Sequence, residues 1–481
     1  MPDTCFTENP EGALELTALP KAGFDAWFGG LSDTAQAWIK TSGFKASPGT
    51  VCLLPGDICG DTSSDAGGDV QAVAGYSDTS ENLLWDWAAI AKALPAGKYR
   101  ISTKLDEDEA ATCMLGWALS QYSFDRYQQK KDKDVDKASE SDRVLVWPEG
   151  ANHKQALSHG AAISLVRNLI NTPANHMGPA ELADVAGELA AMHDGTCVVI
   201  SGEALLEADY PAIHAVGRAS DMEPCLIDLA WGNENAPKVT LVGKGVCFDS
   251  GGLDLKPASS MKLMKKDMGG SAQALGLASM IMEAGIKVRL RVLIPAVENA
   301  VSGNAMRPLD VVDTRKGLTI EIGNTDAEGR VILADALFEA TSEQPDLIID
   351  FATLTGAARV ALGTELPALF CNSNEVAEDI LACGMKVSDP MWRLPLWPGY
   401  KKLVEGKVAD LNNAPEGGFG GAITAALFLE HFVSDENGNV SDWVHLDLMA
   451  WNQSSRPGRP EGGEAMTIRA LFTYLSERFG M

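Results

Sequence analysis

Residues 238–257 have the sequence KVTLVGKGVCFDSGGLDLKP, which joins a run of β-forming residues to a charged, glycine-rich loop. The run KVTLVG has the valine, threonine and leucine content typical of a buried strand. The segment GKGVCFDSGGLDLKP, which begins with the last residue of that run, carries Lys244, Asp249, Asp254 and Lys256 among five glycines and serines. This pattern is too irregular for a simple strand or helix. Charged side chains held in such a loop usually have a functional role.

Strand-like and helix-like segments alternate around this stretch. Strands are predicted for RLRVLIPAV (289–297), TIEIG (319–323) and DLIIDFATL (346–354), and helices for QALGLASMIMEAG (273–285) and GRVILADALFEAT (329–341). Such alternation predicts a mainly parallel central sheet covered by helices. Ligands collect at the carboxyl ends of the strands in these sheets, and Lys244, Asp326 and Thr353 each follow a predicted strand.

The length of 481 residues predicts an α/β protein of two domains, because it exceeds one ordinary core. Residues 1–150 mix short apolar runs with the turn-rich stretch GDTSSDAGGD and the charged segment QQKKDKDVDKASESDR, and we expect a small N-terminal α/β domain there. Apolar residues at helical spacing predict a connecting helix within 151–172. A larger catalytic α/β domain is predicted for 173–481.

The composition excludes several classes of partner. The formal net charge of −27 would repel a phosphate backbone or an anionic membrane. The first twenty residues lack the pattern of a signal peptide, and no window has the apolar length of a membrane span. The 9 cysteines are scattered without a CxxC pair, so we expect reduced, mostly buried thiols. These features predict a cytoplasmic protein that binds neither nucleic acid nor membrane.

Four carboxylates could form a metal centre. Asp249, Asp267, Asp326 and Glu328 could not share one cleft unless cations neutralised them, because carboxylates a few ångströms apart either take up protons or bind metal. Two divalent ions would resolve this conflict. Asp326 and Glu328 are two residues apart and would point the same way in an extended loop. The 7 histidines fall in no pattern such as HExxH, so the predicted site is rich in oxygen.

Four segments in their order and spacing resemble those of the leucyl aminopeptidase (cytosol aminopeptidase) family: GKGVCFDSGGLDLKP, KKDMGG, NTDAEGR and ATLTGA. Further similarity lies in RNLINTPANHMGP, GGFGGAITAALFL and WVHLDL, so the likeness extends from about Arg167 to the C-terminus. NTDAEGR is the most specific of these motifs. The resemblance implies a metallo-exopeptidase that hydrolyses the N-terminal peptide bond of peptides, and a homohexamer.

The resemblance also implies metal ligands. Asp249 and Glu328 would be shared by two metals, Asp326 would bind one of them, and Lys244 and Asp267 would bind the other. Lys244 would have to bind as the neutral amine, which two adjacent cations would favour. The metals would activate a bridging water as the nucleophile and polarise the scissile carbonyl. The free amino group of the substrate would bind a metal, which explains exopeptidase activity.

Further roles follow from the same resemblance. Lys256 would stabilise the oxyanion. Arg330, with backbone groups near Leu354, would hold a bicarbonate ion that carries a proton from water to the leaving amine. The substrate pocket would be lined by Met264, Thr353, Gly356 and Met449. The family commonly has Ile-Ala-Gly after WVHLD, whereas this chain has LMAWN, so Met449 stands where the family has a small alanine. The larger side chain predicts a narrower pocket and a preference for substrates with smaller or slimmer side chains.

Several alternatives stay open at this point. The same carboxylates could serve a narrow dipeptidase, a two-metal phosphoesterase or an oligomer without catalysis. Oxygen ligands with one amine select weakly among zinc, manganese and magnesium. A dinucleotide fingerprint is disfavoured, because Phe248 replaces the third glycine of GxGxxG. We expect Lys262, Lys265 and Lys266 to form a solvated edge.

Overall fold

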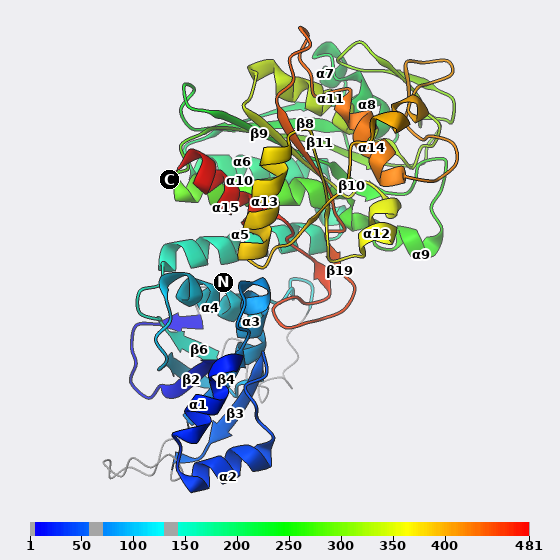
Figure 1. Ribbon diagram of the computed structural model, residues 1–481. Coiled ribbons are helices and arrows are strands. Elements are labelled where there is room, and N and C mark those ends of the chain that lie inside the picture. Colours follow the sequence, from blue (N-terminus) through cyan, green and yellow to red (C-terminus); the bar gives the residue numbers. More distant parts are fainter. Residues whose placement is uncertain (1–4, 57–70, 129–142, 481) are drawn as a thin grey trace. The chain divides into compact units, whose positions relative to one another are not determined.

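The computed structural model describes residues 5–56, 71–128 and 143–480 (Figure 1). The chain divides into two compact units. The first comprises Met1–Ser164, Met385–Ser388 and Gln453–Glu461, and the second Leu165–Gly384, Asp389–Asn452 and Gly462–Met481. Most of the stretches GDTSSDAGGD and QQKKDKDVDKASESDR lie outside the described residues. The domain boundaries predicted from the sequence, 1–150, 151–172 and 173–481, stay a prediction.

The N-terminal unit is built on one sheet in the order β1-β6-β5-β2-β4-β3. Its strands pair in parallel except for β3, which is antiparallel to β4. Trp87 and Trp117 are fully buried in its core. The elements are β1 (Phe6–Thr7), β2 (Leu14–Pro20), α1 (Phe24–Gly29), α2 (Asp33–Ser42), β3 (Thr50–Leu54), β4 (Gln71–Tyr76), α3 (Leu83–Ala93), β5 (Gly97–Ile101), α4 (Glu107–Ser120) and β6 (Arg143–Val146).

The larger unit contains a mixed, mainly parallel sheet in the order β16-β15-β18-β14-β9-β11-β8-β7, with β10 also paired to β11. The centre from β18 to β11 is parallel, whereas β7, β8 and β15 each join by antiparallel pairing. The predicted fold class is therefore confirmed. The strands are β7 (Thr196–Ser201), β8 (Cys225–Trp231), β9 (Lys238–Gly243), β10 (Gly245–Asp249), β11 (Arg289–Asn299), β14 (Leu347–Ala352), β15 (Ala368–Cys371), β16 (Trp392–Arg393) and β18 (Asp442–Asp447).

Helices cover this sheet. Helices α8, α11 and α14 bury side chains with Val242, Leu293 and Ile348 in one hydrophobic cluster. Helix α10 contacts β9 and β14 and packs against α15. The helices are α6 (Pro179–Met192), α7 (Ala204–Glu207), α8 (Pro211–Gly217), α9 (Ala258–Met261), α10 (Gly269–Ala284), α11 (Glu328–Ala340), α12 (Gly356–Leu362), α13 (Asn374–Lys386), α14 (Gly421–Glu430) and α15 (Ile468–Phe479). Helix α5 (His153–Asn171) begins in the first unit and ends in the second.

One predicted strand lies elsewhere. The segment TIEIG forms β13 (Thr319–Glu321), which belongs to a separate small sheet with β12 (Val311–Asp313) and β17 (Leu411–Asn412). The link from β12 to β13 is a short turn, so the two strands pair antiparallel as a hairpin and not as a crossover into the large sheet. Asp326 therefore approaches the site from a different sheet than Lys244 and Thr353.

The parallel strands bring the polar segments to one edge. Lys244 directly follows β9, Thr353 follows β14, and Asp447 is the last residue of β18. The carboxyl ends of parallel strands meet at the same edge of a sheet, where ligands bind in α/β folds. No helix in the described part of the chain is long and apolar enough to cross a membrane. The cysteines in these residues are buried, except Cys197, which is partly exposed.

Candidate metal centre

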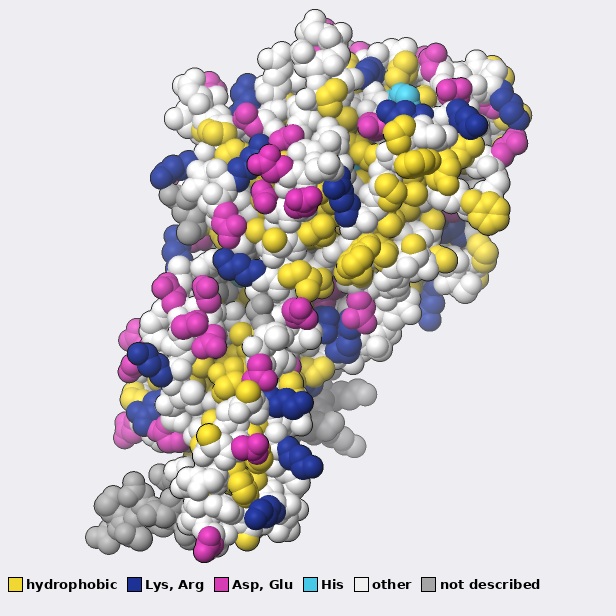
Figure 2. All heavy atoms as spheres, viewed as in Figure 1, with side chains coloured by type: hydrophobic (Ala, Val, Ile, Leu, Met, Phe, Trp, Pro, Cys, Tyr) yellow, Lys and Arg dark blue, Asp and Glu magenta, His cyan; other side chains and the backbone are white. Residues whose placement is uncertain are grey.

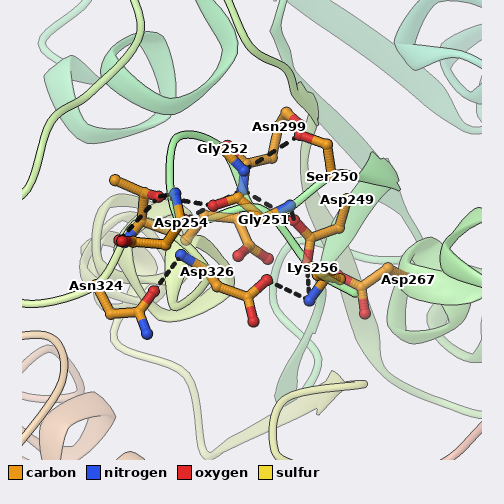
Figure 3. A network of polar contacts seen from close by, with 12 residues as sticks. Asp249, Ser250, Gly251, Gly252, Asp254, Lys256, Asp267, Asn299, Asn324 and Asp326 are labelled. Carbon is orange, nitrogen blue, oxygen red and sulfur yellow. Dashed lines mark hydrogen bonds and ion pairs between the residues drawn. The ribbon is translucent and has the colours of Figure 1, made fainter. Parts of the chain in front are cut away.

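Four acidic side chains meet at this edge from three segments of the chain. Asp249 ends β10, Asp267 lies in the 3-10 helix η8 (Met264–Met268), and Glu328 begins α11, two residues after Asp326. One carboxylate oxygen from each of Asp249, Asp326 and Glu328 lies within 4.8 Å of the other two. Asp326 is partly exposed, with 33% of its side-chain surface accessible, whereas the other acids are buried. Figure 3 shows Asp326 and Asp249 on either side of Lys256.

Two lysines lie among these acids. Lys244 Nζ is 2.7 Å from Asp267 Oδ2 and 3.1 Å from Glu328 Oε1. Lys256 Nζ is 2.7 Å from Asp249 Oδ2 and also contacts Asp326 Oδ1. The five residues predicted as ligands and the predicted oxyanion donor therefore form one connected cluster.

The carboxylates perturb one another strongly. Burial, together with the charge of Asp249, raises the pKa of Glu328 to about 8. Burial and the charge of Asp267 raise the pKa of Asp249. Burial lowers the pKa of Lys244, but attraction to the acids outweighs it and the net pKa is raised. Lys244 must therefore lose a firmly held proton before its nitrogen can bind a metal.

This donor set fits divalent cations. Glu328 Oε2 is buried and accepts no hydrogen bond from the described residues. An unpaired carboxylate oxygen in a buried site is costly unless a cation or a proton satisfies it. Carboxylate oxygens suit magnesium and manganese, and zinc also accepts them.

Two glycines allow the charged residues to approach closely. A Cβ at Gly329 would lie 2.4 Å from Lys244 Cε, so a side chain there would displace the lysine. Gly251 has a φ of +89°, and a Cβ there would lie 2.5 Å from the carbonyl oxygen of Asp254. The glycines of the two signature loops are thus required by this packing.

Arg330 is buried beside the acid cluster. Its Nη1 donates to the carbonyl of Asn413 at 2.6 Å, and its Nε has no hydrogen-bond partner among the residues described. Burial lowers the pKa of Arg330 to about 10, against the attraction of Asp447 and Glu328. The N–H of Leu354 donates to Asp447 Oδ1 at 3.2 Å. Arg330 is therefore a buried cation with a spare donor, whereas the Leu354 N–H already has an acceptor.

The predicted pocket residues have different surroundings. Met264, Thr353 and Met449 are buried, and Gly356 begins α12 at an exposed position. The Thr353 hydroxyl donates to Asp267 Oδ1 at 2.7 Å, so this residue touches the acid cluster itself. The role of these four residues as a substrate pocket stays a prediction.

Two features of the site escaped the sequence analysis. Asn299, the last residue of β11, donates through Nδ2 to Asp249 Oδ1 at 2.8 Å. The rule that placed functional residues at strand ends could have found it. The predicted solvated edge is wrong for Lys266, which is buried 4.0 Å from Asp267 Oδ1. Its neighbour Lys262 is exposed, so the structure separates lysines that look alike in sequence.

Comparison with known families decides the assignment. Residues 164–472 match the model of the cytosol aminopeptidase family, catalytic domain, and residues 14–138 match the M17 aminopeptidase N-terminal domain. The chain belongs to the cytosol aminopeptidase family. The resemblance inferred from the motifs and the enzyme class of a metallo-exopeptidase are thereby confirmed.

Individual relatives of the cytosol aminopeptidase family agree over nearly the whole chain. A protein of Chlorobaculum tepidum named probable cytosol aminopeptidase is 36% identical over 462 residues, which cover 90% of each chain. The crystal structure of the cytosol aminopeptidase from Coxiella burnetii is similar with a TM-score of 0.89 and 45% identity, covering 99% of both chains. The bottromycin maturation enzyme BotP in complex with Mn has a TM-score of 0.83 and 31% identity, covering 97% of this chain and 99% of that one.

Proposed function

We propose that this cytosol aminopeptidase family member is a two-metal enzyme that releases the N-terminal residue of peptides with a free amino terminus. Lys244, Asp249, Asp267, Asp326 and Glu328 would hold the ions. The observation that carries the proposal is the convergence of Asp249, Asp326 and Glu328, with one carboxylate oxygen of each within 4.8 Å of the other two. The buried Glu328 Oε2 accepts no hydrogen bond from the described residues.

The side chains divide the chemical work. Divalent ions bound here supply Lewis acidity toward a water and a carbonyl oxygen. Lys256 lies between Asp249 and Asp326 and would donate to the oxyanion that develops on the scissile carbonyl. Binding of two divalent ions would satisfy the acids that now pair with Lys256 and free its ammonium group for that task.

The metal is proposed to be zinc or manganese, with magnesium as a third candidate. The BotP structure described above is a complex with Mn, and BotP is similar to this chain over nearly its full length. The oxygen-rich ligand set is compatible with manganese.

Arg330 is proposed to hold a bicarbonate ion that moves the proton to the leaving amine. Its buried Nε, which has no hydrogen-bond partner in the part of the chain that the structure describes, supports an anion site. The N–H of Leu354 would have to leave Asp447 to contribute. We expect bicarbonate to change the peptidase rate of the wild type and to leave that of Arg330→Ala unchanged. An equal response in both proteins would contradict this role.

A substrate panel tests the proposed activity. The wild type, loaded with a defined metal, is expected to cleave aminoacyl p-nitroanilides and to leave p-nitrophenyl phosphate intact. Glu328→Ala and Asp326→Ala should lose both hydrolysis and bound metal. Full metal occupancy in Glu328→Ala with wild-type activity would contradict the assignment. Cleavage of dipeptides alone would identify a narrow dipeptidase.

The chain is also proposed to act as a homohexamer in the cytoplasm. Relatives named cytosol aminopeptidase support the location. Figure 2 shows hydrophobic side chains gathered over the region of α12 and α14. In that region Phe419 is 93% exposed and Val360 90% exposed. Exposed apolar groups of this size are typical of surfaces that another chain covers.

A further inference from the structure

Two acids of the proposed metal centre present their oxygens in the same way. Asp267 offers Oδ2 to Lys244 at 2.7 Å, and its Oδ1 accepts from the Thr353 hydroxyl at 2.7 Å. Asp249 offers Oδ2 to Lys256 at 2.7 Å, and its Oδ1 accepts from Asn299 Nδ2 at 2.8 Å. In each carboxylate a neutral side chain donates to Oδ1, while Oδ2 faces a lysine. Asp249 Oδ1 also accepts the N–H of Gly251 at 2.8 Å, and Asp267 Oδ1 also lies 4.0 Å from Lys266 Nζ.

The Thr353 side chain is fully engaged by these neighbours. Its hydroxyl lies 2.7 Å from Asp267 Oδ1 and 3.0 Å from the Asp267 carbonyl, and its single hydrogen favours the shorter contact to the charged acceptor. A Cβ placed on Gly269 would lie 3.2 Å from Thr353 Cγ2, so the methyl group packs against the start of α10. The Thr353 carbonyl accepts from Lys244 Nζ at 3.2 Å. Thr353 therefore touches two of the proposed ligands.

The turn after β14 fixes Thr353 in place. Buried Asp447 accepts the N–H of Leu354 at 3.2 Å and of Thr355 at 3.1 Å through Oδ1, and the Thr355 hydroxyl at 2.5 Å through Oδ2. Thr355 in turn caps α12 by accepting from the N–H of Ala358 at 3.0 Å. The backbone at Thr353 is thus held by β14 before it and by the contacts of Asp447 with Leu354 and Thr355 after it. These contacts fix the position of the Thr353 hydroxyl.

Asn299 is held as firmly at the end of β11. Its Nδ2 also donates to the carbonyl of Thr325 at 3.1 Å, and its backbone carbonyl accepts from the N–H and hydroxyl of Ser250 at 3.1 and 2.7 Å. Figure 3 shows Asn299 beside the loop that carries Asp249 and Ser250. This side chain therefore ties the loop of Asp249 to the loop that carries Asp326.

We propose that Thr353 and Asn299 are positioning residues that orient the carboxylates of Asp267 and Asp249, so that Oδ2 of each points toward the metals. The inference rests on the proposed two-metal function. Partners outside the ligand shell fix the orientation of ligating carboxylates, and their loss typically costs metal affinity. Thr353 would then support the centre, and its predicted place in the substrate pocket stays a prediction.

The Thr353 arm is tested by titrating metal-stripped protein with Mn²⁺ in a calorimeter. Thr353→Val keeps the shape but removes the donor, and the dissociation constant for Mn²⁺ is expected to rise about 10- to 100-fold. Thr353→Ser keeps the hydroxyl and should bind Mn²⁺ like the wild type. Thr341→Val is the matched control, because Thr341 is also buried and its hydroxyl donates to the carbonyl of Phe338 at 2.7 Å. If Thr353→Val does not fold, the dissociation constants for Mn²⁺ of Thr353→Ala and Thr353→Ser are compared instead. Weaker binding in Thr353→Ala alone would support the inference.

The Asn299 arm uses Asn299→Asp, which keeps the shape and replaces the donor by a charge that repels Asp249. We expect Mn²⁺ affinity to fall by at least about tenfold. Asn304→Asp makes the same charge change at an exposed position. Wild-type Mn²⁺ affinity in folded Thr353→Val and Asn299→Asp would overturn the inference and leave the proposed function standing. A wild type that binds no Mn²⁺ and cleaves no peptide would refute the proposed function itself.

Discussion

The ammonium group of Lys256 lies between two acids, 2.7 Å from Asp249 Oδ2 and in contact with Asp326. If it serves as an oxyanion donor, its contribution arises mainly in the transition state. Lys256→Ala should then lower kcat by about 10²- to 10³-fold while the bound metal stays close to that of the wild type. Steady-state kinetics and metal analysis on the same sample check this, with the exposed Lys262→Ala as control. Equal losses of metal and turnover would make Lys256 a ligand.

Met449 tests the predicted pocket at the residue scale. It is buried and precedes Ala450, whose Cβ would lie 2.4 Å from a Cβ on Gly269, so the segment packs against the helix start next to Asp267. Met449→Ala should enlarge the pocket and raise the leucine-to-alanine ratio of kcat/KM. A methylene in an apolar pocket contributes about 1 to 3 kcal/mol of discrimination, so the shift should be graded. An unchanged ratio with p-nitroanilides of both residues would remove Met449 from the pocket.

Motif residues were predictable from sequence because their spacing is tied to chemistry. The structure brings Lys244, Asp249 and Glu328 together with the other predicted ligands. The charges of the carboxylates and the resemblance to the family predict this cluster. The buried state of Lys266 was not predictable, because three nearby lysines give the same local pattern whether or not a neighbouring element covers them. The hydrogen bond from Asn299 to Asp249 was likewise not predictable, because it depends on which loops meet in the folded protein.

At the element scale, composition predicts which segments form strands, but it does not predict which strands pair with each other. KVTLVG and DLIIDFATL are buried on both faces and form the central strands β9 and β14, as their continuous apolar character predicts. TIEIG has a similar composition, yet β13 lies in a hairpin, because connection length and not composition decides the partner. The antiparallel β7 and β8 could not be distinguished from parallel strands for the same reason.

Metal binding should strengthen the links between elements whose charged side chains now meet in ion pairs. The proposed ligands come from β10, η8, the start of α11 and the residue after β9. Mn²⁺ should therefore raise the Tm of the metal-stripped protein, because a ligand at 100 times its Kd stabilises the folded state by about 2.7 kcal/mol. Differential scanning fluorimetry measures the shift. Glu328→Ala should show a smaller shift, and Glu188→Ala, an exposed change on α6, should match the wild type. Equal shifts in Glu328→Ala and the wild type would place the metal elsewhere.

At the scale of the whole molecule, the chain combines a net charge of −27 with an exposed apolar surface. The charge opposes non-specific association, since like-charged molecules repel. The proposed association through the apolar surface would therefore have to be specific enough to overcome that repulsion. A symmetric oligomer meets this requirement, because each copy contributes the same complementary contacts and the assembly closes.

The apolar surface around the GGFGG turn, formed by Val360, Trp397, Tyr400 and Phe419, is where we expect that association. Trp397 is 56% exposed, and the Tyr400 ring lies 3.3 Å from a Cβ placed on Gly420, so the turn and the Tyr400 segment are neighbours. A Cβ on Gly421 would lie 3.2 Å from Ala357 Cβ, which brings α12 and Val360 to the same region. Burial of apolar area contributes about 25 cal/mol per Å², and a glutamate in its place adds a charge that must be desolvated.

Phe419→Glu and Trp397→Glu should therefore convert the assembled protein into smaller species. Light scattering coupled to size-exclusion chromatography gives the mass, which for the wild type should be six times the 51.1 kDa of one chain. Met192→Glu, at an exposed apolar position at the end of α6, is the matched control and should leave the mass unchanged. Mn²⁺ affinity should persist in all three variants, because none of these side chains belongs to the acid cluster. A wild type that elutes as a single 51.1 kDa chain at every concentration would contradict the homohexamer. Unchanged mass in Phe419→Glu and Trp397→Glu would instead move the contact to another surface.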